Sequence, residues 1–309
     1  MTKPLKNKTA PISAKQSISE AFGIILRHNF EYMQSWAEAA YLGKDIEGVH
    51  QVRVAFRRMR STMVLFRKAI PREITDPWST EMRWIASEMG PARDLDVFID
   101  EGLREMAGKI PLTEGEQKLM DLALKQQKEA YVRVRAMFDG ERYKTFEKDF
   151  DLWLTNCGWF QADLSAPVRA KLNTSIRIYA AKVLNKRVTK VLQAGERKDQ
   201  MSIDELHQLR IEGKKLRYAT DFFSPMFGES GMAEFNSHLK SLQGLLGTMN
   251  DVSVMPGLID GLLEGIKDVD TIKYAGAAIG WRAREYEEVR GELDARWTAF
   301  SNTAFPWLK

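Results

Sequence analysis

The chain of 309 residues has little of several features that mark particular classes of protein. Its one cysteine, Cys157, excludes an internal disulfide and a zinc site built from thiolates. A single cysteine is also typical of a reducing compartment, so we expect a cytoplasmic protein. The longest apolar runs fall short of the roughly 18 residues that a membrane-spanning helix requires, and the N-terminus lacks the apolar core of a signal peptide. We therefore expect no membrane partner.

Bulk charge is also scarce. The net formal charge is only +4, so any preference for anions must come from clusters of cations. The hydrophobic content of 44% is typical of a globular protein, and a chain of this length can bury a sizeable core.

Strand signals are few, whereas apolar residues at helical spacing run through the chain, which predicts an all-α fold. Pro91 should kink or split its helix, and Gly244 with Gly247 should interrupt another. Residues 1–13 are expected to form a flexible basic arm and residues 301–309 a tail. The predicted helices span 15–42, 46–69, 76–106, 114–138, 142–156, 169–194, 202–224, 230–264 and 270–299.

One segment of the sequence occurs twice. Residues 49–66 read VHQVRVAFRRMRSTMVLF, and residues 206–223 read LHQLRIEGKKLRYATDFF, at an offset of 157 residues. At the same offset, GPARDLDV of residues 90–97 falls on GTMNDVSV of residues 247–254. Two motifs in one register predict a duplicated unit of helices, with one repeat over about 15–140 and the other over about 169–299.

Both copies of the long motif place cations along one face of a helix and apolar side chains on the opposite face. Like charges at this spacing cost energy unless an anion is present, so two such faces point to a shared, extended anion. Arginine matches phosphate oxygens with planar paired donors, and a phosphate beside a buried histidine would favour its protonated ring. We call the two faces the first stripe, which holds His50, Arg53, Arg57 and Arg60 with Arg58 on its flank, and the second stripe, which holds His207, Arg210, Lys214 and Arg217 with Lys215 on its flank.

The paired H-x-x-R-x-x-x-[RK]-[RK]-x-R helices, each followed by a G-x-x-x-D element, resemble a CHAD domain, the conserved histidine α-helical domain. The resemblance covers residues 14–300. It implies two antiparallel four-helix bundles related by a pseudo-two-fold axis, with a basic central cleft. It also implies that the residues of both stripes bind inorganic polyphosphate. Polyphosphate granules are a further expected partner, and we expect no cofactor.

The second copy departs from the pattern, because Asn250 and Ser253 stand where the first has Arg93 and Asp96. The carboxylates Asp94 and Asp251 occur in both copies. They are interpreted as groups that orient a motif arginine, with a helix N-cap as the alternative.

Three alternatives stay open at this point. The first is a divalent metal site made of His50 and His207 with Asp94, Asp96 and Asp251, although the neighbouring cations would repel the ion. The second is an RNA-binding protein, whose affinity also comes from phosphates, although no reading helix is evident and nucleic acid is not the expected partner. The third is a phosphate hydrolase, which usually requires acidic residues that hold Mg²⁺; no such motif occurs, so we expect no enzyme.

Overall fold

The computed structural model describes residues 4–6, 8–197 and 200–308, and that part of the chain is helical without a strand. The predicted all-α class is therefore confirmed. The helices of the first half are α1 (Ile18–Leu42), α2 (Ile46–Leu65), α3 (Arg72–Glu88), α4 (Gly90–Val97), the π-helix η1 (Phe98–Leu103), α5 (Arg104–Met106) and α6 (Thr113–Asp139). They are followed by α7 (Glu141–Thr155), α8 (Gly158–Gln161), α9 (Ala166–Leu172), α10 (Ile176–Gly195), α11 (Ile203–Phe223), η3 (Ser224–Met226), α12 (Glu229–Leu262), α13 (Val269–Gly291), α14 (Leu293–Ser301) and η4 (Pro306–Leu308).

Of the two predicted helix breaks, one is confirmed and the other is wrong. Pro91 does split its helix, because α3 ends at Glu88 and α4 begins at Gly90. The expected interruption at Gly244 and Gly247 is wrong, since α12 continues through both glycines. Packing against α11, α13 and α14 keeps this helix intact despite the low helix propensity of glycine. The last predicted helix, 270–299, is divided into two helices, because α13 ends at Gly291 and α14 begins at Leu293.

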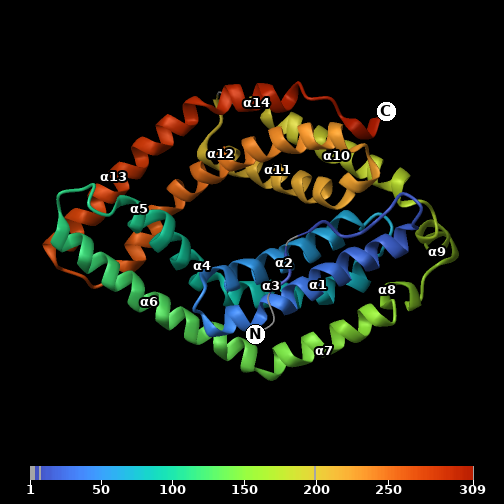
Figure 1. Ribbon diagram of the computed structural model, residues 1–309, viewed down its shortest axis with the longest axis horizontal. Helices are drawn as coiled ribbons and strands as arrows, with labels where there is room; N and C mark the ends of the chain where they lie inside the picture. The colour runs from blue at the N-terminus through green and yellow to red at the C-terminus, as the bar shows by residue number, and fades with distance from the viewer. Residues whose placement is uncertain (1–3, 7, 198–199, 309) are drawn as a thin grey trace.

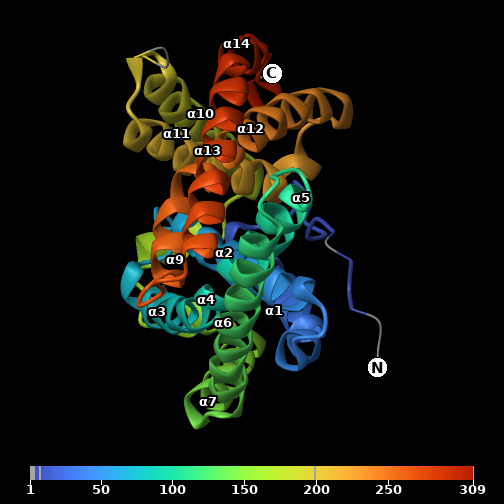
Figure 2. The same cartoon turned by 90° about the vertical axis from the view of Figure 1, so that its left-hand side faces the viewer.

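The helices form a ring-like arrangement in which α2 and α11 face each other across the middle of the molecule (Figure 1). At one end of this ring α6 packs against α13, and Figure 2 looks onto that crossing. At the other end α1 contacts α10, where Ser17 and Ser175 form an isolated antiparallel bridge. At the offset of 157 residues α1, α2 and α6 fall on α10, α11 and α13, whereas α3, α4, η1 and α5 fall on the single helix α12. The pseudo-two-fold symmetry itself stays a prediction.

Caps and one glycine position the two helices that carry the stripes. Asp45 caps α2 by accepting a hydrogen bond from the backbone N–H of Glu47, and Ser202 caps α11 in a capping box with Glu205. Gly48 lies so close to α1 that a Cβ there would come within 2.4 Å of the backbone of Ala39. Only glycine permits this approach, which fixes the start of α2 and therefore the position of the first stripe.

Aromatic rings join the C-terminal ends of α2 and α11. The ring centroids of Phe66 and Phe223 lie 6.0 Å apart, and Tyr179 donates a hydrogen bond to the carbonyl of Leu65 at 2.8 Å. The Arg58 guanidinium lies over the Phe222 ring at 5.7 Å. These buried contacts hold the two stripe helices together at one end.

The beginning of the described chain packs on α1. Ala10 and Ile12 are buried, and His28 Nε2 donates to the backbone carbonyl of Lys8 at 2.8 Å. From Lys8 onward the expected flexible arm is thus part of the packed body. Within the described residues, no helix is long and apolar enough to cross a membrane.

Candidate functional site

A cavity of about 730 Å³ lies between the two halves, beside α2 and α11. Four of the predicted site residues line it, two from each stripe: His50, Arg57, Arg210 and Lys214. The cavity also receives Arg93 from α4. The structure therefore brings cations from both copies of the motif to one space.

The other residues of the first stripe lie outside the cavity lining. Arg53 donates to the backbone carbonyl of Ala86 in α3, which holds its guanidinium against the first half. Arg58 is only 6% exposed and packs on α11 through Phe222, so its place is structural. Arg60 is half-buried, and burial, followed by the charge of Arg83 on α3, lowers the pKa of its guanidinium.

In the second stripe, three predicted residues lie outside the cavity lining. The exposed His207 donates from Nδ1 to Oδ1 of Asn250 at 2.6 Å, which fixes its ring beside α12. Arg217 is exposed, and the Lys215 ammonium is paired with Glu212 at 2.5 Å. This stripe therefore continues from the cavity onto the surface.

The repeated aspartates lie beside motif arginines. Asp251 is 4.0 Å from the Arg210 guanidinium, and the charge of Asp94 acts on Arg53 in the first half. Neither aspartate is an N-cap, because α4 begins four residues before Asp94 and Asp251 lies inside α12. The orienting role fits this geometry, whereas the cap does not.

The surroundings of His50 favour its neutral ring. Burial and, next to it, the nearby Arg93 guanidinium are the main causes that lower the pKa of His50 to about 4. Arg57 and Arg53 add to this effect, while Glu47 opposes it. The protonated ring expected beside a phosphate therefore requires enough negative charge to overcome both burial and these cations.

The cations of the cavity repel one another. Burial, followed by the charges of Arg210 and Arg57, lowers the pKa of Lys214 to about 8. Burial is also the main cause that lowers the pKa of Arg210, with Arg57 again contributing. Such mutual repulsion, held in a half-buried place, is relieved by an anion.

The rest of the cavity lining, which we call the second wall, has a different character. It comes from the end of α4, from η1, α5 and α13 and from the C-terminal part of α12, and it includes carboxylates and apolar side chains beside Arg282. The cavity is therefore not basic throughout, and Asp94 and Asp251 also line it next to the stripe cations. The residues of this wall are Val97, Phe98, Glu101, Gly102, Glu105, Val252, Val254, Met255, Leu258, Arg282 and Glu285.

Sequence reasoning did not place Arg93 or Arg282 in the site. Arg93 was visible in the short motif, but its role could not be read from a copy that has asparagine at that position. Arg282 pairs with Glu285 and donates to the backbone carbonyl of Glu101, so it joins α13 to η1 at the cavity lining. The offset of 157 residues aligns Arg282 with Lys125, and this shared positive charge was the available signal.

The set of residues for the alternative metal site is not assembled. Asp96 is buried and accepts hydrogen bonds from Gln127 at 2.7 Å and Tyr131 at 2.9 Å. His50 lines the cavity, whereas His207 is held at the surface by Asn250. Among the residues that the structure describes, no group of three or more His, Cys, Asp and Glu side chains is arranged to hold a metal ion.

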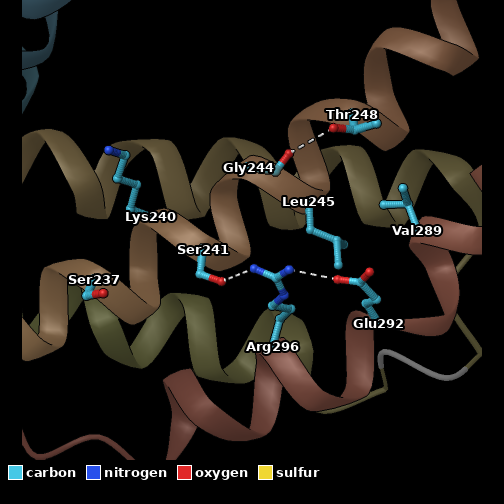
Figure 3. A pocket seen from close by; sticks show the side chains of 9 residues that line it. All are labelled: Ser237, Lys240, Ser241, Gly244, Leu245, Thr248, Val289, Glu292 and Arg296. Carbon is cyan, nitrogen blue, oxygen red and sulfur yellow. Dashed lines mark hydrogen bonds and ion pairs between the residues drawn. The ribbon is translucent and has the colours of Figure 1, made fainter.

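A second groove, of about 540 Å³, lies between α12 and the α13–α14 region (Figure 3). Its one arginine, Arg296, donates to the Ser241 hydroxyl and pairs with Glu292 at 2.7 Å. No residue of either stripe lines this groove, so the cavity beside α2 and α11 is the candidate site.

Comparison with known proteins agrees with this fold. The family model described as the CHAD domain matches residues 24–260. The crystal structure of the CHAD domain from the plant Ricinus communis is 23% identical, covers 99% of each chain and superposes with a TM-score of 0.84. PptA from Streptomyces chartreusis is 14% identical, with 92% of this chain and 100% of that chain covered and a TM-score of 0.65. At these identities the likeness concerns the fold, and no match was found among curated proteins.

Proposed function

Since the chain belongs to the CHAD domain family, as its two motifs indicated, we propose that it binds inorganic polyphosphate along the cationic wall of the cavity without hydrolysing it. The observation that carries the proposal is the meeting of Arg57 from α2 with Arg210 and Lys214 from α11 in one half-buried space. Cations that repel one another there are stabilised by a polyanion, and each contact gains from the low local dielectric.

An extended chain suits the stripes better than a single phosphate does. Arg57 and Lys214 belong to different helices, and Arg217 carries the second stripe onto the surface. A chain of phosphates contacts cations inside the cavity and outside it at once, whereas orthophosphate meets only a few. Affinity should therefore rise with chain length until the stripes are covered.

The proposed contacts differ in strength. Arg57, Arg210 and Lys214 should contribute most, because all three line the cavity and none of them is fully exposed. His207 and Arg217 should contribute less, because exposed charges are screened by water and salt. Arg58 and Lys215 should act indirectly, since one packs on Phe222 and the other is paired with Glu212.

The test is calorimetric titration with polyphosphates of defined length and with orthophosphate. We expect tight binding of long chains at low salt, weaker binding as salt rises because counterions are released, and much weaker binding of orthophosphate. Equal affinity for orthophosphate and long chains would remove the proposal. Release of orthophosphate from the bound chain, followed over hours, would contradict the non-catalytic part.

Single-stranded RNA is the comparison ligand in this titration. Its phosphates carry bases that a half-buried cavity must accommodate, so polyphosphate should displace it at equal phosphate concentration. Displacement in the opposite direction would favour the RNA alternative. We further propose that the protein acts in the cytoplasm and associates with polyphosphate granules, which imaging of a tagged chain in cells with and without polyphosphate would test.

A further inference from the structure

The two walls of the cavity suit different parts of one ligand. The wall toward α2, α4 and α11 carries the cations Arg57, Arg93, Arg210 and Lys214, together with the carboxylate of Asp94. The second wall carries carboxylates from η1, α5 and α13, an apolar strip on α12, and Arg282, whose charge is paired with Glu285. A bare phosphate chain would use mainly the cations of the first wall, because the carboxylates of the second would repel it.

The apolar strip lies open to the cavity. Val254 and Leu258 are four residues apart on α12, so their side chains lie on one face of that helix, and both line the cavity. Val254 is 57% exposed. An occupant with a flat apolar part would remove this surface from water, which a phosphate group cannot do favourably.

Carboxylates accompany the strip. Glu105 lines the cavity and makes no hydrogen bond or ion pair with the residues that the structure describes. Glu101 lies 3.9 Å from the Arg93 guanidinium, at the border between the two walls. An ionised carboxylate only accepts hydrogen bonds, so the part of a ligand that lies here must donate them.

We propose that the cavity binds nucleoside polyphosphates, with the phosphates on the cationic wall and the base on the α12 strip, where its N–H groups donate to the carboxylates. Guanine suits this wall, because it presents two neighbouring donors to one carboxylate. The cavity of about 730 Å³ has the size of known small-ligand sites, roughly 300–1,000 Å³. The inference rests on the proposed phosphate-binding wall and adds a second ligand class to it.

The experiment compares GTP with tripolyphosphate by calorimetry at matched salt and pH, without divalent ions. Tripolyphosphate has the same number of phosphates and no less charge, so charge alone makes it the tighter ligand or an equal one. We expect GTP to bind about tenfold more tightly, the factor that corresponds to about 1.4 kcal/mol from base contacts.

Two variants locate the base. Val254→Ser should bring GTP affinity down toward that of tripolyphosphate and leave tripolyphosphate unchanged. Its matched control is Val132→Ser, because Val132 on α6 is also 57% exposed but does not line the cavity, and it should change neither affinity. Glu105→Gln should lower the ratio of GTP to tripolyphosphate affinity, because one acceptor is lost while repulsion of phosphate is relieved.

The outcomes separate this inference from the proposed function. Tripolyphosphate binding as tightly as GTP, or tighter, overturns the inference while long polyphosphate binding still stands. Loss of GTP affinity in Val132→Ser equal to that in Val254→Ser also overturns it. If GTP, tripolyphosphate and long polyphosphate all fail to bind, the proposed function itself is wrong.

Discussion

The two copies of the repeated motif hold similar residues in different surroundings. In the first half, His50 lies beside Arg93 in the cavity, and burial with the neighbouring cations lowers its pKa to about 4. In the second half, the equivalent histidine is exposed and donates to Asn250, which stands where the first half has Arg93. The two equivalent histidines thus differ in burial and in their neighbour, an arginine that repels a protonated ring in one half and an asparagine that accepts a hydrogen bond in the other.

The flanking cations show the same contrast. Arg58 is buried against Phe222 at the junction of α2 and α11, whereas its counterpart Lys215 pairs with Glu212 nearer the surface. The first copy therefore combines cations that line the cavity with the packing that joins α2 to α11, while the flanking residue of the second copy lies in an ion pair. The two copies share the spacing of their cations, and burial gives these cations different surroundings.

The largest expected effect on stability separates these flanking residues. Arg58→Ala should lower the free energy of unfolding by about 2 kcal/mol, because a desolvated cation–π contact and a packed side-chain stem are lost. Lys215→Ala, the matched change in the other copy, should cost about 0.5 kcal/mol or less, as exposed ion pairs do. Urea denaturation followed by circular dichroism measures both. Equal losses would mean that the two copies pack alike.

A middle-sized effect concerns pH. Because burial and neighbouring cations hold the pKa of Lys214 at about 8, its charge is lost as pH rises from 7 to 9, and polyphosphate affinity should fall about tenfold with one charged contact. Binding at pH 8 should take up about half a proton, seen as a dependence of the calorimetric heat on the buffer. Lys214→Arg keeps its charge and should abolish both effects. If the pH dependence of affinity and the proton uptake persist in Lys214→Arg, another group is responsible for them.

The smallest expected effect is on the pKa of His50 when Arg93 is replaced by asparagine, the residue at the equivalent position of the second half. Arg93→Asn should raise the pKa of His50 from about 4, by less than about one unit, because burial remains the larger cause. Between the folded pKa and the ordinary 6.5, the native state holds fewer protons than the unfolded chain, so His50 lowers stability as pH falls. The variant should narrow the pH range over which His50 lowers the stability of the folded protein. NMR titration of the His50 ring reads the pKa directly, and an unchanged value would remove Arg93 as a cause.

Local sequence signals predicted much of the fold. Helical periodicity identified the helices, and Pro91 identified the break between α3 and α4, because a missing backbone donor acts wherever it occurs. The break predicted at Gly244 and Gly247 does not occur, because the penalty of a glycine within a helix is only about 1 kcal/mol and the packing of α12 outweighs it.

The candidate site was predicted in part for a related reason. Spacing placed Arg57 and Lys214 on cationic faces, and the structure brings both to the cavity. Spacing within a helix cannot tell which other helix lies opposite, so the carboxylates of η1, α5 and α13 were not foreseen. Whether a stripe residue points to the cavity, as Arg210 does, or packs elsewhere, as Arg58 does, depends on how α2 and α11 cross.

The central claim is that polyphosphate binding depends on the half-buried cations of both stripes and not on bulk charge. The most direct test compares Arg57→Ala/Lys214→Ala with Lys6→Ala/Lys8→Ala at matched salt, since both pairs remove the same formal charge and Lys6 and Lys8 are exposed. The first pair should weaken binding of a long polyphosphate at least about tenfold more than the second, because its contacts are desolvated and the others are screened. Equal losses, with helicity intact by circular dichroism, would contradict the account.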